Sequence, residues 1–508
     1  MPPAVSYRMM ATAADPLIAL SGESQRALRA FADQAFSRAA GAPLIPGNRV
    51  RLLRDARENY AAWMEAIRGA RRTIYFESYI IHSDDVGRQF ADLLALKARE
   101  GVRVRIIYDW MGALGHTRWN FWRPLRRAGM EVRCFNPPRF DSAFGWLSRD
   151  HRKSIIVDGR IAFVTGLCVG RRWAGYPERG VASWRDTGVE IEGPAVPDVE
   201  RAFAAAWAEC GSPLPKSELA YNAAARTAGT ISLRIIPSRP GTLAMYRLDQ
   251  LIAALARESI WLTDAYFVGT SSYVQALRAA ASDGVDVRLL LPRAGDVPVV
   301  RAISRAGYRT LIEAGVRIFE WNGPMLHAKT AVADGRWARV GSTNLNLASW
   351  LGNWELDVVV EDEGFASEMQ AMYLDDLKHS TEIILSHNRR PRPVLPRRLR
   401  PRPRGAARGS ANWAAKGVLR IGNVVGAAMT NRRVLGPAES SLMLTSGLAL
   451  AVFIAMTIFL PRVVAGALAL LSTWIAVTLL VQAWRLRRPR NQDTKDAPDA
   501  PPSSSQGS

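Results

Sequence analysis

The stretch His151-Arg-Lys-Ser-Ile-Ile-Val-Asp-Gly-Arg160 returns 176 positions later as His327-Ala-Lys-Thr-Ala-Val-Ala-Asp-Gly-Arg336. His, Lys and Asp keep the same spacing in both copies, and an Ala-x-Val sequence comes shortly after each Gly-Arg. One such triple arises by chance in about one chain in thirty, but two triples with matching flanks do not. The sequence therefore predicts an internally duplicated protein whose active site is built from two His/Lys pairs.

A strand–helix–strand pattern surrounds the two copies and repeats as well. It is predicted at 73–77, 86–100 and 102–108, and again at 259–263, 272–283 and 285–291. Gly101 and Gly284 follow the predicted helices and are typical helix stops. A further helix at 298–314 and a strand at 316–320 lead toward the second copy. Strands that alternate with helices favour an α/β fold with parallel strands.

The C-terminal part of the chain has a different composition. Residues 442–460 and 463–484 carry no charge, and each run is long enough to cross a bilayer core of about 30 Å. Arginine is concentrated outside the pair, at 432, 433, 485, 487, 488 and 490, which predicts that both ends of this hairpin lie in the cytoplasm. A buried hairpin of a soluble protein is the alternative interpretation.

We therefore expect an α/β protein of two lobes related by a pseudo-twofold axis, each a mixed sheet flanked by helices, with a C-terminal transmembrane helical hairpin. The expected parts are an N-terminal helical segment at 1–47, a first lobe at 48–215, a second lobe at 216–388, a basic Pro/Arg linker at 389–410, an amphipathic helix at 411–434, two transmembrane helices within 440–485 and a disordered tail at 486–508.

Charge and cysteine content narrow the class of protein. The 508 residues carry a formal net charge of +21 and a sequence pI of about 10.6, a balance that suits nucleic acid or an anionic membrane surface. The three cysteines are too few and too widely spaced for a disulfide framework or a structural zinc site. The first twenty residues lack the sustained apolar run of a secretory signal.

The chemistry of the repeated motif points to a phosphodiester substrate. Residues two apart in a strand face the same side, so His151 lies beside Lys153 and His327 beside Lys329. Two ammonium groups can balance the charge that develops on phosphate oxygens. One imidazole can attack phosphorus and form a phosphohistidine, while the other acts as acid and base. This chemistry requires no metal and no cofactor.

Six further polar residues are candidates for supporting roles. Asp158 and Asp334 sit at turns before glycine, and we interpret them as structural rather than chemical, although a catalytic role stays open. Ser342 and Asn344 share a strand face and can donate hydrogen bonds to phosphate oxygens. Asn353 and Glu355 share another, and Glu355 is a candidate to orient an imidazole through its second nitrogen.

These motifs resemble the phospholipase D superfamily and, within it, the bacterial cardiolipin synthases. The paired His-x-Lys-x4-Asp motif carries the superfamily resemblance. The synthase resemblance rests on Leu311-Ile-Glu-Ala-Gly-Val-Arg-Ile-Phe-Glu320, on Met325-Leu-His-Ala-Lys-Thr330 and on Trp184-Arg-Asp-Thr187 before Ile191-Glu-Gly-Pro194. The resemblance covers about residues 45 to 388.

The resemblance implies a reaction, a location and roles for the two histidines. Two phospholipase D-type lobes would transfer a phosphatidyl group from one phosphatidylglycerol to a second and so form cardiolipin. His151 would be the nucleophile and His327 the acid/base. The implied location is the bacterial plasma (inner) membrane, with the lobes on the cytoplasmic side. Phospholipids and an anionic membrane surface are the expected partners, no nucleic acid is expected, and the oligomeric state stays open.

One departure from the family pattern and three alternative functions stay open. Thr165-Gly-Leu-Cys168 places Cys168 where the family usually has Asn, and Cys is a poor hydrogen-bond donor. A phospholipase D hydrolase would use water as the acceptor. A nuclease of the same superfamily would fit the positive charge, and a membrane scaffold with a decayed site is the non-enzymatic alternative.

Overall fold

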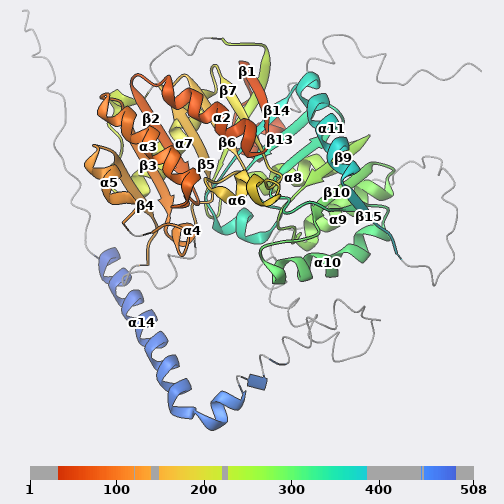
Figure 1. Ribbon diagram of the computed structural model, residues 1–508. Helices are drawn as coiled ribbons and strands as arrows, with labels where there is room; N and C mark the ends of the chain where they lie inside the picture. Colours follow the sequence, from red (N-terminus) through yellow and green to blue (C-terminus); the bar gives the residue numbers. More distant parts are fainter. Residues whose placement is uncertain are drawn as a thin grey trace, which may run out of the picture. The chain divides into compact units, whose positions relative to one another are not determined.

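The computed structural model describes residues 33–118, 120–138, 148–219, 227–385, 448, 451–452 and 454–487. The chain divides into two units, Met1–Pro137 with Ser148–Ser446, and Pro138–Leu147 with Gly447–Ser508. The first unit contains both copies of the His-Lys motif. Figure 1 colours its first half from red to yellow and its second half from green to teal.

The two halves of the first unit have matching elements. The first half contains strands β1 (Ile45–Arg54), β2 (Thr73–Ser78), β3 (Arg103–Asp109), β4 (Glu131–Phe135), β5 (Lys153–Val157), β6 (Ile161–Thr165) and β7 (Thr187–Glu192) and helices α2 (Asp55–Arg68), α3 (Asp85–Arg99), α4 (Trp110–Ala113), α5 (Trp122–Arg127), α6 (Arg171–Ala174) and α7 (Val196–Glu209), with single 3-10 turns η2 (Pro177–Arg179) and η3 (Lys216–Glu218). The second contains β8 (Ile231–Ser238), β9 (Ser259–Thr263), β10 (Asp286–Pro292), β11 (Arg317–Trp321), β12 (Thr330–Ala333), β13 (Trp337–Gly341), β14 (Glu355–Glu361), β15 (Ser380–Ile383), α8 (Ala244–Leu255), α9 (Ser271–Ser282), α10 (Pro298–Ile312), α11 (Glu363–Lys378) and the π-helical turn η5 (Ala348–Gly352).

The strand order confirms the duplication. In the described residues all strands form one mixed sheet in the order β15-β11-β10-β9-β12-β13-β14-β8-β1-β7-β6-β5-β2-β3-β4. Read outward from the β8–β1 pair, β14 matches β7, β13 matches β6, β12 matches β5, and β9 to β11 match β2 to β4. Only β15 lacks a counterpart among the described strands. The predicted helices and strands of the repeat fall within one or two residues of α3, α9, α10 and the strands beside them.

The register places both motifs at one end of the strands. Strands β2, β3 and β4 are parallel, as are β9, β10 and β11. β5 runs antiparallel to β2 and pairs Lys153 with Ser78, while β12 runs antiparallel to β9 and pairs Thr330 with Thr263. Both His-x-Lys segments therefore enter the sheet where β2 and β9 end, which is the usual position of ligand sites in α/β sheets.

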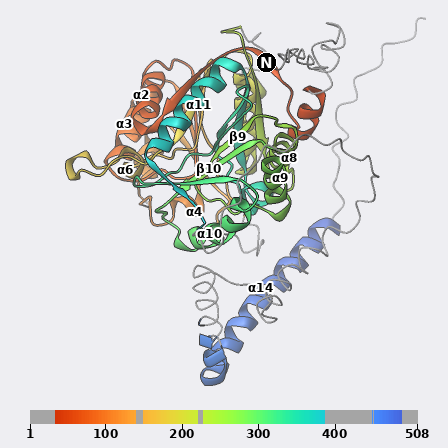
Figure 2. The same ribbon diagram turned by 90° about the vertical axis from the view of Figure 1, so that its right-hand side faces the viewer.

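The two half-sheets enclose a layer of helices. The largest apolar cluster joins residues of α7 and α11 with the inner faces of both half-sheets, such as Val189 and Val358. Separate clusters pack α2 and α3 on the outer face of the first half-sheet and α8 and α9 on that of the second. Figure 2 shows these two helix pairs on opposite flanks, with strands and α11 between them. Alternate residues of β2 accordingly point to different clusters, Tyr75 inward and Phe76 outward.

A buried asparagine joins the halves at the β1–β8 pair. Asn48 has no exposed surface, and its Nδ2 donates to the carbonyl oxygens of Ile45 at 2.7 Å and Ile231 at 3.4 Å. Its Oδ1 accepts from the Ala195 amide at 2.9 Å. The pairing is irregular here, so the side chain satisfies backbone groups that the ladder leaves open.

The second unit contains α14 (Pro461–Arg487), which includes the predicted apolar run 463–484. In the described part of the chain, no helix combines the length and the apolar character that a bilayer crossing requires. Most of the predicted N-terminal segment, the basic linker, the amphipathic helix and most of the predicted tail lie outside the described residues, as does part of the run 442–460.

Candidate active site

The first His/Lys pair lies at the start of β5. The Nζ of Lys153 donates to the carbonyl oxygen of His151 and stands 5.4 Å from the ring centroid of Tyr79. The same tyrosine ring lies edge-on to His151, at 5.0 Å between centroids. Tyr79 directly follows β2, so the end of that strand supports both groups of the motif.

The second pair repeats this arrangement at the start of β12. The Nζ of Lys329 donates to the His327 carbonyl oxygen and stands 5.8 Å from the ring of Tyr266. Tyr266 follows β9 and lies 6.0 Å from His327. Two tryptophans, Trp173 and Trp184, also contact His327, and each has its ring centroid 5.7 Å from that of the imidazole. Among the described residues, His327 therefore has more aromatic neighbours than His151.

Each imidazole is oriented by a carboxylate from the other half of the chain. His151 Nδ1 lies 2.9 Å from Glu355 Oε2, and His327 Nδ1 lies 2.6 Å from Asp186 Oδ2. Both carboxylates are fully buried. A carboxylate accepts the Nδ1 proton and so leaves Nε2 as the reactive nitrogen. The assembled site thus requires both halves.

The backbone crosses between the halves in the same way. The amide of His151 donates to the Trp354 carbonyl oxygen at 2.9 Å, and the amide of His327 donates to the Arg185 carbonyl oxygen at 2.7 Å. Trp354 precedes Glu355, and Arg185 precedes Asp186. Each orienting carboxylate therefore follows a residue that is already paired with the histidine's own backbone.

Burial and neighbouring charges lower the pKa values of both motif histidines. Burial, with help from Lys329, lowers the pKa of His327 to about 4 against the opposing charge of Asp186. Burial likewise lowers the pKa of His151, against Glu355, and both motif lysines add to this effect. Both imidazoles are therefore neutral at pH 7 before a substrate binds.

The pKa values of Lys329 and Glu355 respond to the same buried environment. Burial lowers the pKa of Lys329 to about 8, and Lys153 adds to this although Asp186 opposes it. Burial alone would raise the pKa of Glu355, but His151 and Lys153 outweigh it and the pKa falls. Two ammonium groups that act on each other mark a site suited to an anion that would neutralise both.

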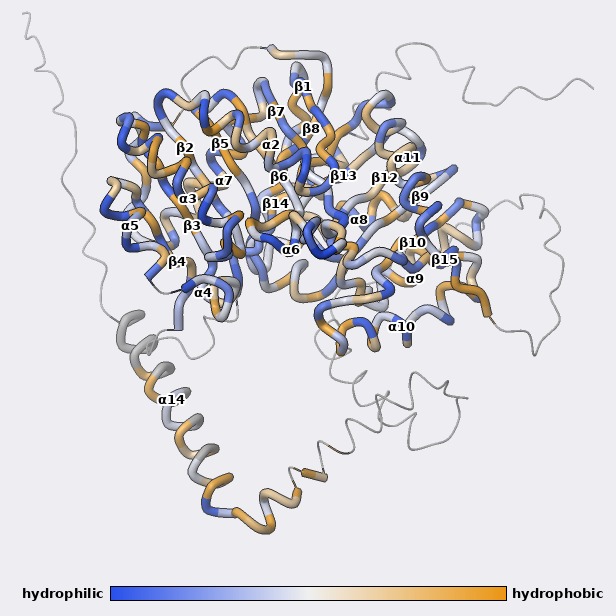
Figure 3. The backbone as a smooth tube through the Cα atoms, in the orientation of Figure 1, coloured by the Kyte–Doolittle hydropathy of each residue, from blue (hydrophilic) through white to orange (hydrophobic). Residues whose placement is uncertain are grey.

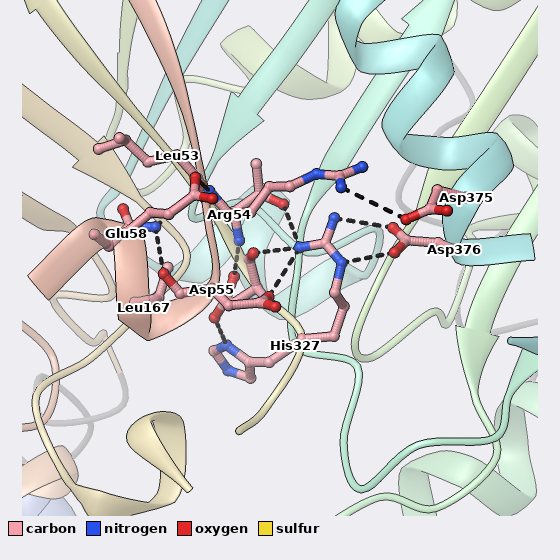
Figure 4. Close-up of polar contacts among 12 residues, drawn as sticks. Leu53, Arg54, Asp55, Glu58, Leu167, His327, Asp375 and Asp376 are labelled. Carbon is pink, nitrogen blue, oxygen red and sulfur yellow. Dashed lines mark hydrogen bonds and ion pairs between the residues drawn. The ribbon is translucent and has the colours of Figure 1, made fainter. Parts of the chain in front are cut away.

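A buried arginine fixes the carboxylate behind His327. Arg185 Nε and Nη2 donate to the two oxygens of Asp376, at 2.8 and 2.9 Å, and Nη1 donates to Asp55 Oδ1 at 3.1 Å. Asp55 Oδ1 also accepts from the Asp186 amide at 2.9 Å. Figure 4 shows this network running from Asp376 on α11, through Asp55 on α2, to His327. We name Arg185, Asp55 and Asp376 the arginine clamp.

The supporting residues predicted after the second motif lie close to Glu355. Asn353 Nδ2 donates to Glu355 Oε1 at 3.4 Å. Ser342 Oγ accepts from the Leu356 amide at 2.9 Å, so it holds the strand that carries Glu355. Asn344 is buried, and its Oδ1 has no hydrogen-bond partner among the described residues.

The motif aspartates bind backbone amides at the opposite end of the strands. Asp158 accepts from the amides of Arg71, Arg72 and Thr73 at 2.7 to 3.0 Å. Asp334 accepts from those of Arg257, Glu258 and Ser259 at 2.9 to 3.0 Å. Both aspartates have positive φ, +56° and +48°, in the turn before glycine. Each aspartate therefore ties the backbone at the start of β2 or β9 to the turn that follows the motif strand.

Cys168 occupies the buried position that corresponds to Asn344. Burial raises the pKa of its thiol, against the opposing charges of Lys153 and Lys329. The Tyr60 hydroxyl donates to the Cys168 carbonyl oxygen at 2.6 Å. The first half thus has a buried thiol at the position where the second half has a buried amide.

Sequence reasoning missed Asp186, although it noted the segment that contains it. A usable signal exists: Asp186 immediately precedes β7, and Glu355 begins β14, the strand that matches β7 in the order of the sheet. An acidic residue at the start of each of these strands is the pattern that would have identified the pair.

Comparison with known proteins defines the class. The family model described as "Cardiolipin synthase, PLD-like domain" matches residues 63–207 and 249–377, one copy in each half. Phosphatidylserine synthase from Haemophilus influenzae superposes with a TM-score of 0.55 at 14% identity, covering 69% of this chain and 91% of that one. The fold is thus that of the phospholipase D-like class.

Relatives with similar sequences narrow the class to one family. Cardiolipin synthase A of Pseudomonas fluorescens is 34% identical over 362 residues, which cover 69% of this chain and 73% of the relative. Cardiolipin synthase of Alkalihalophilus pseudofirmus is 31% identical over 348 residues, covering 68% and 69%. The chain belongs to the family of phospholipase D-like cardiolipin synthases. It is an enzyme, a phosphatidyltransferase of the phospholipase D type.

Proposed function

We propose that this enzyme makes cardiolipin by transferring a phosphatidyl group from one phosphatidylglycerol to another. The observation that carries the proposal is the crossed pair of histidine–carboxylate contacts beside two lysines, in a chain of this family. Two neutral imidazoles, each with Nδ1 held by a carboxylate and Nε2 left to react, provide a nucleophile and an acid/base, and two ammonium groups provide a phosphate site.

The first half of the reaction forms a covalent intermediate. The His151 Nε2 lone pair attacks phosphorus, the bond from phosphorus to the glycerol oxygen breaks, and a P–N bond forms. His327 Nε2–H gives its proton to the departing oxygen, and glycerol leaves. The bound phosphate anion offsets the charges of Lys153 and Lys329, which raises the pKa of His327 and lets it carry that proton.

The second half transfers the group to lipid. His327 takes the proton from a hydroxyl of a second phosphatidylglycerol, and that oxygen attacks phosphorus. The P–N bond breaks, His151 regains its lone pair, and cardiolipin leaves. Assigning His151 as the nucleophile is supported by the greater exposure of its side chain, 12% against 6% for His327. Three aromatic side chains surround His327 and limit access of water to the acid/base.

Product analysis with purified protein tests the proposal. With labelled phosphatidylglycerol, we expect cardiolipin and free glycerol in equal amounts, and His151→Ala should lower the rate by about 10³-fold or more. His379→Ala, which changes an exposed histidine, is the matched control and should leave the rate unchanged. Phosphatidic acid without cardiolipin would instead identify a hydrolase.

We also propose that residues 440–485 anchor the enzyme in the bacterial plasma membrane as a two-helix hairpin, with the lobes on the cytoplasmic side. Support comes from the uncharged runs at 442–460 and 463–484 and from the arginines that flank them. Deleting 440–485 should release the protein from alkali-washed membranes. A deletion variant that stays in the washed membrane would contradict the proposed anchor.

A further inference from the structure

Six aliphatic side chains are exposed on connections that leave the sheet at the active-site end. We name them the aliphatic rim: Leu114 (58% exposed), Val297 (41%), Val299 (63%), Ile303 (39%), Leu347 (55%) and Leu351 (36%). Leu114 follows β3 and α4, the next three lie before or in α10 after β10, and the last two lie at η5 after β13. These strands end where the His-Lys segments begin.

Direct contacts tie the rim to the catalytic groups. The Tyr266 hydroxyl donates to Asp296 Oδ1 at 2.8 Å, one residue before Val297. The Tyr266 carbonyl oxygen accepts from Asn346 Nδ2 at 3.0 Å, one residue before Leu347. Tyr266 itself lies against His327, as described above. In both second-half parts of the rim, a residue next to the rim is therefore hydrogen-bonded to Tyr266, once through its hydroxyl and once through its backbone carbonyl.

The first-half part of the rim, Leu114, lies at the same end of the sheet as the second-half parts. Burial and the Arg172 guanidinium lower the pKa of His116, and the Asp296 carboxylate opposes them. Leu114, two residues before His116, follows α4, which begins where β3 ends, and β3 runs parallel to β2 toward the end of the sheet at which the first His-Lys segment begins. The rim thus borders the site from both halves of the chain.

Helix α10 exposes apolar residues where a helix of a soluble protein is normally polar. Ser304, Tyr308 and Leu311 face the core, while Val299 and Ile303, four residues apart, share an exposed face. Figure 3 shows hydrophobic and hydrophilic stretches alternating along this helix. Exposed basic residues accompany the rim: Arg118 after Leu114, Arg172 near His116, and Arg293 between β10 and α10.

We propose that the aliphatic rim, with its arginines, is the surface by which the catalytic unit docks on an anionic lipid bilayer. The proposal rests on the proposed function, because docking of the rim would let a lipid headgroup enter the site while its acyl chains stay in the membrane. Aliphatic side chains among arginines fit an apolar layer beneath anionic headgroups. A second copy of the same surface would bring like charges together, which favours the bilayer as the occupant.

A dye placed on the rim tests contact with lipid independently of activity. Val299→Cys in the full-length protein is labelled with an environment-sensitive dye, and the signal of the labelled parent chain is subtracted. Vesicles rich in phosphatidylglycerol should shift the emission to the blue, and neutral phosphatidylcholine vesicles should do so much less. The control is Leu255→Cys, since Leu255 is 52% exposed and lines a 670 Å³ cavity with Asp334, at the end of the strands opposite the site.

The outcomes of this experiment separate the occupants. Equal shifts at both positions, or no shift at Val299, would overturn the proposal. A shift at Val299 without vesicles, together with a doubled molar mass in light scattering, would assign the rim to a second copy of the chain and also overturn it. If the parent chain makes no cardiolipin but the dye shifts as expected, the proposed function fails while the docking surface stands.

Negative charges introduced into the aliphatic rim test whether the rim is needed for activity on membrane-bound lipid. The double variant Val299→Asp/Ile303→Asp should lose about tenfold or more activity on phosphatidylglycerol in vesicles, because two carboxylates oppose insertion. Its activity on monomeric short-chain phosphatidylglycerol should stay that of the parent chain. Equal losses on both substrates would show damage to the site itself, and equal retention would show that the rim is dispensable; either result contradicts the proposal.

Discussion

At the scale of single residues, the site depends on two carboxylates that reach across the halves. Glu355 and Asp186 differ by one methylene, yet both contact Nδ1 of their histidine. The half with the shorter acid has Gly166, where an added Cβ would meet Asp186 Oδ1 at 2.2 Å; the other half has Ser342 at the corresponding place. The two halves thus make the same histidine–carboxylate contact with acids of different length.

Neutralising either carboxylate should disable its histidine. Glu355→Gln and Asp186→Asn keep the shape of the side chain but offer an amide to Nδ1, which favours the wrong tautomer. We expect each change to lower kcat by about 10²- to 10⁴-fold. Glu190→Gln, which alters a largely buried carboxylate further along β7, is the control. Retention of more than half the activity in Glu355→Gln would refute the orienting role.

The depressed pKa of Lys329 predicts an alkaline limit to activity. Lys329 must be charged to bind phosphate, and its pKa in the free enzyme is about 8. The value of kcat/KM should therefore fall as pH rises through about 8. Lys329→Arg should move this limit to higher pH, because guanidinium keeps its proton to above pH 12, while exposed Lys378→Arg should not. An alkaline limit unmoved by Lys329→Arg would assign the titration to another group.

At the scale of elements, helices α2 and α11 hold the segment before β7 through the arginine clamp. Asp376→Asn weakens the bidentate pair of buried Arg185 and should destabilise the fold by about 3 kcal/mol. It should also lower kcat at a temperature where the protein is fully folded, because the Asp186 backbone loses support.

The buried pair Asp249–Arg339 between α8 and β13 provides the matched control for the arginine clamp. Asp249→Asn should cost similar stability and leave kcat unchanged. Denaturant titration and steady-state rates measure the two effects separately. If both variants keep full kcat, the arginine clamp serves stability alone.

Most elements of the fold were predictable, because the signals that define them lie within each element's own sequence. Apolar periodicity and the helix-ending Gly101 and Gly284 defined α3, α9 and their strands within one or two residues. The contacts across the halves were harder to predict, because Asp186 pairs with a histidine 141 positions away. Only a comparison of the residues at the start of β7 and β14 would have indicated this pair. Glu355 was recognised only through the need of an imidazole for an orienting acid.

At the scale of the whole molecule, the β1–β8 pair joins the half-sheets and so brings the crossed contacts together. Asn48→Ala leaves buried backbone groups without partners and should lower the free energy of unfolding by about 1 to 3 kcal/mol. Exposed Gln275→Ala should not change it. The product of the folded enzyme should remain the same in both. An unchanged denaturation midpoint in Asn48→Ala would show that the junction does not depend on this side chain.

Duplication was evident from the sequence, but the contacts by which each half supports the other's histidine were not. Two His-x-Lys-x4-Asp motifs predict two lobes with one shared site, and the palindromic strand order agrees. The sequence does not indicate which side chains of the second half serve the first. That information lies in the pairing of Trp354 with His151 and of Arg185 with His327.

The most direct test of the account is to locate the covalent intermediate. A phosphatidyl p-nitrophenol substrate has a leaving group that needs no proton, so His327→Ala should still be phosphatidylated but should turn over slowly. After an alkaline quench, which preserves phosphohistidine, peptide mapping should find the phosphatidyl group on His151, and His151→Ala should carry none. A phosphatidyl group on His327, or none on either histidine, would contradict the account.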